Sequence, residues 1–414
     1  MGDANVLRKK VLIVWEHGGN LGHLSRLLPV ALALRQAGYD VVFSVADVSS
    51  ARRYLGALHF DFVMLPRIVL LVAHESGALN HADVFLKAGF GEAGRAKLCI
   101  RQWHDLFKSV KPAAVLVDSS PFALYAARSA GVPALAIGHG FEIPPSQGAR
   151  PCFTPWVENA VDKAKDLESR LHQAFEDLSQ SLPVALRLNA PKSVDDLFQP
   201  HQAALCTWPE FDHFDRKIVR TGMSSAYVGP IWANALTSEK PNWSEDDGPK
   251  VLCYLNLRDK RYDFVWQALK QHGANVLVIS PHGVPGACEA ARGWGIQIIE
   301  NPVLLDSLMR NCDAVVGHGG MGLTSLALHR GKRTLLLPEH MEQAILAYRL
   351  SKQGLATATI KFRDKSLIQK KVTELLTSDV LKHRAKSFSE VHCHYLPNEA
   401  VQLVVSSLVN LTDY

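Results

Sequence analysis

The stretch Asp313–Gln343 reads DAVVGHGGMGLTSLALHRGKRTLLLPEHMEQ. Its residue types predict, in order, a buried strand, a glycine turn, a helix and a second buried strand, at Ala314–Val316, His318–Gly322, Leu323–His329 and Thr334–Leu337. A helix that starts at a glycine turn after a parallel strand presents free backbone N–H groups at the positive end of its dipole, where phosphates bind. His318 adds a donor that can carry a proton. The alternative is a tight turn with an incidental histidine.

The chain begins with the same pattern. The predicted order is a buried strand, a glycine-rich loop, a helix and a second strand, at Val11–Trp15, Glu16–His23, Leu24–Gln36 and Asp40–Val45. Such units build a parallel sheet whose ligands lie at the carboxyl ends of the strands, so the loop that carries His23 lies at such an end. A dinucleotide site is the lesser alternative, because the loop contains only Gly19-x-x-Gly22 of the usual three-glycine pattern.

Two further strands end in polar residues. Asp118 follows the strand Ala113–Val117, and His139 follows the strand Val132–Ile137. We therefore expect His23, Asp118 and His139 on one edge of one sheet. A carboxylate beside a histidine selects its tautomer and stabilises the imidazolium, as in acid–base pairs.

Each of these residues also has a plainer interpretation. Asp118 could serve as a helix cap, and His23 could be a loop histidine that caps a helix. His139 could be structural. His17 is the rival candidate for the base.

The second half repeats the α/β pattern after a polar, acidic and proline-bearing linker. We predict an N-terminal Rossmann-like domain, a linker, a C-terminal Rossmann-like domain and a last amphipathic helix. Their boundaries are 1–236, 237–249, 250–396 and 397–414.

Composition excludes several classes of protein. The chain has 414 residues, 47% of them hydrophobic and 21% charged, and its net charge of +5 gives no reason to propose nucleic acid as a partner. Its seven scattered cysteines favour reduced thiols in a cytoplasmic protein. We expect no metal site, because the cluster His392-Cys393-His394 has no second ligand pair at a zinc spacing. The apolar runs are too short for a signal peptide or a membrane helix, which leaves at most a peripheral membrane contact.

The segment Glu300–Gln343 resembles the donor-binding signature of the UDP-glycosyltransferase superfamily, glycosyltransferase family 1, in a bacterial-type form. Matching positions are Pro302, His318, Gly320, Gly331, Pro338 and Gln343, and Glu342 stands where the family usually has aspartate. This resemblance implies the GT-B fold, in which two Rossmann-like domains face each other across a cleft. It implies that residues 1–236 bind the acceptor, that residues 250–396 bind the nucleotide sugar, and that the last helix crosses back to the first domain. It also places Gly22-His23 at the family's catalytic base and Asp118 at the partner of that base.

Four positions depart from the signature. Glu300 replaces the tryptophan that stacks on uracil, Val303 replaces a glutamine, Leu326 replaces the glutamate that binds the ribose, and Arg333 replaces a proline. The phosphate and sugar end of the signature is kept while the nucleoside end is altered. A nucleotide other than UDP, or another way of holding it, becomes plausible.

The resemblance implies an inverting, metal-independent, hexosyltransferase-type glycosyltransferase in which His23 is the base and Asp118 orients it. Its co-substrate is a nucleotide-diphosphate sugar, with no other cofactor, and its acceptor is a small molecule. The implied donor-binding residues are Pro302, Val303, His318, Gly319, Gly320, Met321, Gly322, Leu323, Thr324, Glu342 and Gln343. The implied acceptor-lining residues are His17, His139 and Phe141, and apolar loops suggest a lipophilic acceptor. A nucleotide-sugar epimerase on the same fold and a binding protein without catalysis are the alternatives.

Overall fold

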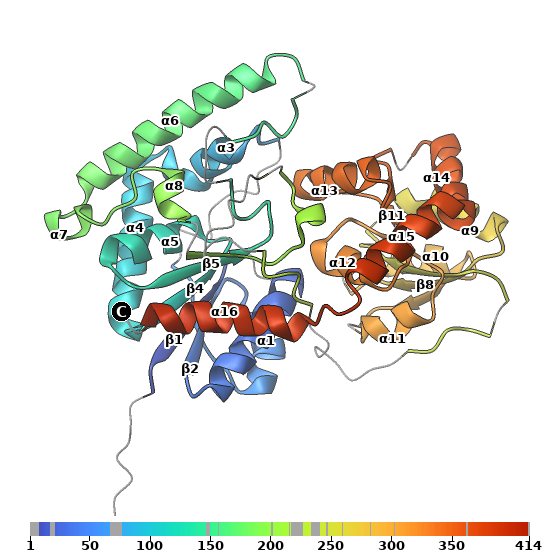
Figure 1. The fold of residues 1–414 in the computed structure, drawn as a ribbon, viewed down its shortest axis with the longest axis horizontal. Coiled ribbons are helices and arrows are strands. Elements are labelled where there is room, and N and C mark those ends of the chain that lie inside the picture. The colour runs from blue at the N-terminus through green and yellow to red at the C-terminus, as the bar shows by residue number, and fades with distance from the viewer. Residues whose placement is uncertain are drawn as a thin grey trace, which may run out of the picture. The chain divides into compact units, whose positions relative to one another are not determined.

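The computed structural model describes residues 8–16, 21–66, 77–145, 150–155, 157–199, 202–214, 216, 227–232, 241–245, 247–258, 260–281, 283–301, 303–361 and 363–412. The chain divides into two compact units. Unit 1 comprises Met1–Ile231 together with Pro397–Tyr414, and unit 2 comprises Trp232–Leu396 (Figure 1).

The described residues of unit 1 form a six-stranded parallel sheet in the order β3-β2-β1-β4-β5-β6. The strands are β1 (Lys10–Trp15), β2 (Asp40–Val45), β3 (Asp61–Met64), β4 (Ala114–Asp118), β5 (Ala134–Gly138) and β6 (Ala203–Leu205). Every residue of β4 and β5 is buried, which explains their continuous apolar runs, because a parallel sheet is covered on both faces. In the register of the sheet, Trp15 at the end of β1 lies opposite Asp118 at the end of β4.

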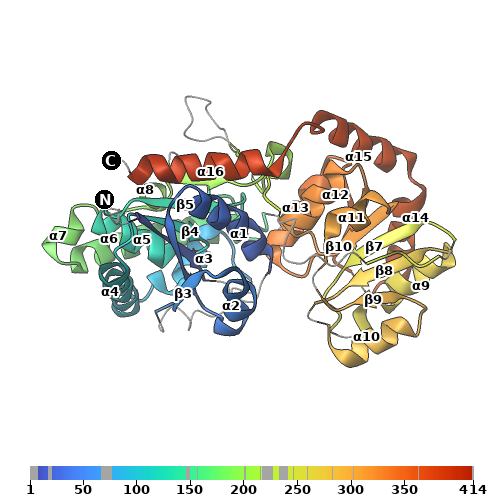
Figure 2. The same cartoon turned by 90° about the horizontal axis from the view of Figure 1, so that it is seen from below.

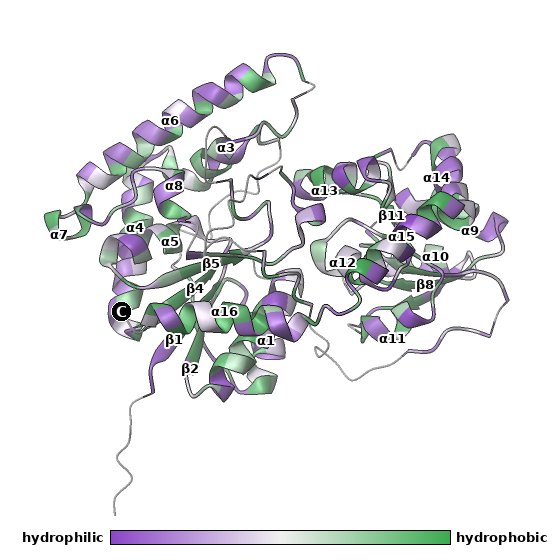
Figure 3. Ribbon diagram, viewed as in Figure 1, coloured by the Kyte–Doolittle hydropathy of each residue, from purple (hydrophilic) through white to green (hydrophobic). Residues whose placement is uncertain are grey.

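Helices cover both faces of this sheet. They are α1 (Leu21–Gln36), α2 (Val48–Tyr54), α3 (His81–Phe85), α4 (Ala93–Val110), α5 (Pro121–Ala130), α6 (Ala160–Ser181), α7 (Val184–Arg187), α8 (Val194–Leu197) and α16 (Pro397–Thr412), with short turns η1 (Gly56–Leu58), η3 (Leu86–Phe90) and η5 (Pro209–Phe211). The C-terminal α16 packs against α1 and against β4 and β5, so the end of the chain completes unit 1 (Figure 2). Helix α4 packs against α5 and α6. Figure 3 shows α6 with alternating apolar and polar bands, as expected for a helix with one buried side.

The described residues of unit 2 form a second six-stranded parallel sheet, in the order β12-β11-β10-β7-β8-β9. Its strands are β7 (Lys250–Tyr254), β8 (Asn275–Ile279), β9 (Gln297–Ile299), β10 (Ala314–Gly317), β11 (Arg333–Leu336) and β12 (Thr357–Ala358). Its helices are η6 (Lys260–Tyr262), α9 (Asp263–Gln271), α10 (Pro285–Arg292), α11 (Leu305–Arg310), α12 (Met321–His329), α13 (Met341–Lys352), α14 (Lys365–Thr377) and α15 (Asp379–Val391). Helix α14 packs on α9 and β11, and α12 packs on α15.

The predicted α/β class, with two successive parallel sheets, is confirmed. Two helix starts differ from expectation. Helix α1 begins at Leu21 and not at Leu24, so His23 lies inside the helix and is not a loop histidine. Helix α12 begins at Met321 and not at Leu323, so Met321 and Gly322 of the predicted turn belong to the helix. Glu342 and Gln343 lie in the first turn of α13. Among the helices that the structure describes, none is long and apolar enough to cross a membrane.

Candidate active site

His23 and Asp118 meet at the carboxyl edge of the sheet of unit 1. His23 Nδ1 lies 3.0 Å from Asp118 Oδ2, and the Asp118 side chain is fully buried. The chain turns sharply after β4, because Ser119 adopts a left-handed conformation with φ 50°. Ser120, and not Asp118, then forms the N-cap of α5, so the interpretation of Asp118 as a helix cap is wrong. Its carboxylate is directed at the imidazole.

Arg26 and Glu142 join this pair. Arg26 follows His23 by one turn of α1, and its Nη2 donates to Asp118 Oδ1 at 2.6 Å and to Glu142 Oε1 at 2.9 Å. Glu142 lies in the loop after β5, where its Oε2 accepts a hydrogen bond from the backbone N–H of His139 at 2.7 Å. We call His23, Arg26, Asp118 and Glu142 the charged cluster.

The charges of this cluster control its protonation. Burial lowers the pKa of His23, but the carboxylates of Asp118 and Glu142 outweigh that effect, and the net pKa lies above its ordinary value. Burial raises the pKa values of Asp118 and Glu142, yet the guanidinium of Arg26 and the imidazole of His23 bring both below their usual range. Both carboxylates are therefore ionised at neutral pH.

Three groups of the cluster are of types that bind metals. One ligand atom each of His23, Asp118 and Glu142 lies within 4.8 Å of the others. The guanidinium of Arg26 already bonds both carboxylates, so a cation there would have to displace it. The donor set fits an arginine better than a metal ion.

His139 and Phe141, predicted to line the acceptor site, lie in the same loop as Glu142. His139 Nε2 is 3.6 Å from Glu142 Oε1, and its ring stacks on that of His213 with centroids 5.0 Å apart. Phe141 contacts the rings of His81 and Phe153, at 5.6 and 5.1 Å. The predicted site residue His17 lies outside the described residues.

A buried ion pair between Asp212 and Arg216, which we call the ionic brace, holds this loop. Asp212 accepts hydrogen bonds from Arg216 Nε at 2.6 Å and from the Tyr227 hydroxyl at 2.7 Å. The guanidinium of Arg216 also donates to the carbonyl oxygens of Gly140 and Ile143, which flank Phe141 and Glu142. Arg216 therefore holds the loop that carries Glu142 by hydrogen bonds to the backbone of that loop.

The glycine turn His318–Gly322 lies at the carboxyl end of β10 in unit 2. Gly319 has φ 94°, a conformation that favours glycine, and it approaches the backbone oxygen of Gln343 so closely that an added Cβ would lie 3.4 Å away. Gly320 forms the N-cap of α12 and contributes no capping side chain. An added Cβ at Gly320 or Gly322 would meet nothing within 4 Å. The start of α12 is therefore open to an anion.

His318 differs from its predicted role as a donor that can carry a proton. Its Nε2 accepts a hydrogen bond from the backbone N–H of Asn256 at 2.9 Å, and its Nδ1 donates to the carbonyl oxygen of Leu337 at 3.1 Å. Burial, the largest influence, holds its pKa below the ordinary value. Both ring nitrogens of neutral His318 are thus used to tie the ends of β7 and β11 to the glycine turn, and the backbone amides of α12 are the donors left for a phosphate.

The other predicted donor-side residues surround the same sheet edge. In α12, Thr324 Oγ1 donates to the carbonyl oxygen of Gly320 at 2.9 Å, while Met321 is buried and Leu323 half-buried. In α13, Gln343 Oε1 accepts from the backbone N–H of Glu339 at 2.9 Å, and Glu342 lies 3.6 Å from His340. Val303 is half-buried between β9 and α11, and Pro302 lies outside the described residues.

The two main departures from the nucleoside end of the signature are also visible. Glu300, at the position of the uracil-stacking tryptophan, forms an ion pair with Arg292 at the end of α10. Leu326, at the position of the ribose-binding glutamate, is buried in α12 with 3% of its surface exposed. Glu300 cannot stack on a base as a tryptophan does, and Leu326 cannot accept a hydrogen bond from a ribose hydroxyl.

Solved structures resemble the whole chain. The glycotransferase of kitacinnamycin matches with a TM-score of 0.68 and 16% identity, over 97% of this chain and 99% of that one. The glycosyltransferase VinC in complex with DTDP matches with a TM-score of 0.64 and 15% identity, over 98% and 99%. The spinosyn rhamnosyltransferase SpnG complexed with thymidine diphosphate matches with 0.64 and 14%, over 96% and 99%. No protein-family model and no curated protein matches the sequence.

The chain has the GT-B fold. Two residues of its charged cluster were not among the predicted site residues. Arg26 stands three positions after His23, a spacing that places both on one side of a helix once the helix is known to begin at Leu21. Glu142 directly follows Phe141, in a loop already singled out. These positions alone do not single out either residue, because an arginine on a helix and a glutamate in a loop are most often exposed.

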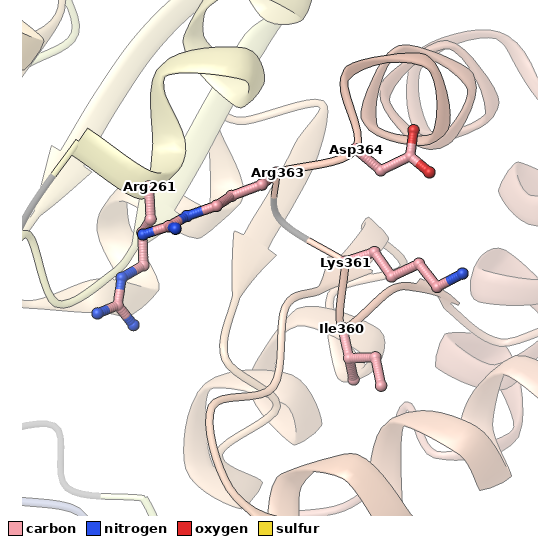
Figure 4. A pocket seen from close by; sticks show the side chains of 5 residues that line it. All are labelled: Arg261, Ile360, Lys361, Arg363 and Asp364. Carbon is pink, nitrogen blue, oxygen red and sulfur yellow. The ribbon is translucent and has the colours of Figure 1, made fainter.

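A cavity of about 560 Å³ in unit 2 of this GT-B chain has a mainly basic lining, whose residues follow strands β7 and β12. Its lining residues are Arg261, Ile360, Lys361, Arg363 and Asp364 (Figure 4). Arg261 Nη1 bonds Glu339 Oε1 at 2.9 Å. Figure 4 shows Arg363 extending toward Arg261, and Lys361 and Asp364 directed away from it, so not all of the lining cations converge on one ligand position.

Proposed function

We propose that the chain is an inverting glycosyltransferase, which moves a sugar from a nucleotide-diphosphate sugar to a hydroxyl group of a small acceptor. The observation that carries this proposal is the buried pair of His23 and Asp118 at the sheet edge of unit 1. With Nδ1 held by the carboxylate, Nε2 is the nitrogen that can take a proton from an acceptor hydroxyl.

The proposed reaction needs two groups of the chain. As Nε2 of His23 takes the proton, the acceptor oxygen bonds to the anomeric carbon and the bond from that carbon to the diphosphate oxygen breaks. Attack on the side opposite the leaving group inverts the anomeric carbon. The open start of α12 stabilises the negative charge of the departing diphosphate through backbone amides, so the proposal requires no metal.

Thymidine diphosphate sugars are the first donors to test. VinC and SpnG were solved with this nucleotide, and they share the fold of this chain. The ion pair of Glu300 and the burial of Leu326 leave no uracil stacking or ribose carboxylate of the kind that the resemblance implies. We therefore propose a nucleotide held mainly by its diphosphate.

We further propose a small, lipophilic acceptor and a cytoplasmic enzyme. The rings of His81, Phe153 and Phe214 are buried and pack together. Phe141, which contacts this group and directly precedes Glu142, is half-buried, so it offers apolar surface near the proposed base. The seven cysteines are all free, which fits a reducing compartment.

Calorimetric binding of dTDP, UDP and GDP to the full chain tests the donor site. In the variant G320D, the new carboxylate caps the amides of α12 and repels a diphosphate, so we expect nucleotide binding to be lost while the melting temperature is kept or raised. The control G286D adds the same charge to the first turn of α10, where an added Cβ also meets nothing within 4 Å. It should bind nucleotide as wild type does. Equal affinity of G320D and wild type would exclude the glycine turn as the diphosphate site.

A binding protein without catalysis is the second candidate. The lost nucleoside contacts at Glu300 and Leu326 favour it. Nucleotide binding without turnover, over a panel of sugar nucleotides and hydrophobic alcohols, would support this candidate against the transferase.

A further inference from the structure

Three charged groups, and not one, face Nδ1 of His23. Asp118 Oδ2 lies at 3.0 Å, Arg26 Nη2 at 3.3 Å and Glu142 Oε1 at 3.4 Å. These groups come from β4, from α1 and from the loop after β5. A base oriented by one carboxylate would need only the first of them.

Arg26 resolves the electrostatic problem that two buried carboxylates create. Like charges in a buried site repel, so each carboxylate raises the pKa of the other. Because Nη2 of Arg26 bonds one oxygen of Asp118 and one of Glu142, both carboxylates remain ionised with their oxygens on the Nδ1 side of the ring. The side chain of Arg26 is only 7% exposed, so bulk water does not screen the charge of its guanidinium.

The charge balance depends on the protonation of His23. Two carboxylates and one guanidinium leave a single net negative charge beside the neutral imidazole, and protonation of the ring brings the cluster to neutrality. Two further titratable groups and one hydroxyl face this cluster, and Arg26 together with His139 lowers the pKa of Glu142. His139 lies 3.6 Å from Glu142 Oε1, and burial raises the pKa of the Cys206 thiol to about 12, so that thiol stays neutral. Ser119 Oγ donates to Asp118 Oδ1 at 3.3 Å.

We propose that Arg26 and Glu142 are positioning residues of the base: Glu142 is a second carboxylate on Nδ1 of His23, and Arg26 holds both carboxylates in place while it limits the negative charge that the imidazole feels. This inference rests on the proposed function for its catalytic meaning. The arrangement itself is a property of unit 1 and can be tested without turnover.

The test is a titration of the His23 imidazole by ¹⁵N NMR in the full chain, with H23N used to assign the signals. E142Q removes one negative charge, so the pKa of His23 should fall. R26M removes the positive charge, so that pKa should rise, and R26K should stay close to wild type. The control E168Q removes a carboxylate that pairs with Arg150 in the same unit, and it should leave the titration unchanged.

The pH profile of transfer gives the second readout. The acid limb, where the rate falls because His23 becomes protonated, should move to lower pH in E142Q and to higher pH in R26M. At a fixed acidic pH, the rate should fall about tenfold for each pH unit by which the limb moves upward. A purely structural role would lower the rates without moving the limb in opposite directions. If R26M does not fold, R26K and E142Q still decide the question.

An unchanged His23 titration in E142Q would overturn the inference, as would a shift of the same sign in E142Q and R26M. If wild type transfers no sugar while the titration shifts as expected, the proposed function fails and the arrangement of the cluster stands.

Discussion

Glu16 provides a test of the structure that does not depend on activity. This residue follows β1, and its Oε2 is shielded from solvent without a hydrogen-bond partner among the described residues. Burial raises the pKa of Glu16 from 4.5 to about 8, and the nearby Ser120 hydroxyl offsets this only in part. The perturbation is E16Q, which keeps the shape of the neutral carboxyl group and removes its titration.

The sign and size of the effect follow from linkage. Between pH 4.5 and about 8 the folded chain holds a proton on Glu16 that the unfolded chain has released. The contribution of Glu16 to stability is therefore complete below pH 4.5 and is lost as pH rises through about 8. Within this window wild type should lose about 1.4 kcal/mol per pH unit relative to E16Q. For a unit of this size that corresponds to roughly 3 to 5 °C per pH unit in melting temperature.

Thermal unfolding followed by circular dichroism at half-unit steps from pH 5 to pH 8.5 measures this difference. E158Q, the same substitution at an exposed position, is the matched control and should run parallel to wild type. We expect E16Q to gain on wild type steadily as pH rises and the gain to level off above pH 8. Parallel curves for E16Q and wild type would refute the protonated state of the shielded Glu16 carboxyl group, and a gain toward low pH would refute the sign of the reasoning.

Three further substitutions follow from the geometry. Asp118→Asn removes the carboxylate on His23, so kcat for transfer should fall by roughly 10²- to 10³-fold and the pH profile should shift to lower pH; a rate within threefold of wild type would contradict this. Gly319→Ala places a Cβ on a backbone with φ 94°, which should cost about 1 kcal/mol in urea unfolding and weaken nucleotide binding measured by calorimetry. Gly140→Ala would bring a Cβ within 2.1 Å of Asp212 Oδ1, so unfolding in urea should show a loss of about 1–3 kcal/mol, and unchanged stability would argue against the ionic brace.

The sequence predicts the fold well because parallel strands leave a strong signal. Val11–Trp15 is apolar without interruption because both faces of β1 are covered. The glycine turn after β10 indicates that a helix begins there. The same rules bring His23 and Asp118 together, because the ends of adjacent parallel strands share one edge. These features follow from local pattern and simple topology.

The remaining features of the site depend on tertiary contacts that no local pattern encodes. The role of Arg26 follows only when β4 and the loop after β5 both place a carboxylate beside it. His318 was expected to donate to a phosphate, but its two nitrogens are used by Asn256 and Leu337, which lie 62 and 19 residues away in the chain. Pairings of this kind become visible only when the strands are in register.

Acceptor-dependent release of nucleoside diphosphate, by wild type and by His23→Ala, tests the central claim most directly. The measurement uses dTDP sugars first, then UDP and GDP sugars, with a panel of lipophilic alcohols, and the anomeric configuration of the product is read by NMR. We predict release that depends on acceptor, an inverted product, and a loss of about 10²- to 10⁴-fold in His23→Ala with nucleotide affinity unchanged. A product of retained configuration, or a His23→Ala variant as fast as wild type, would contradict the account.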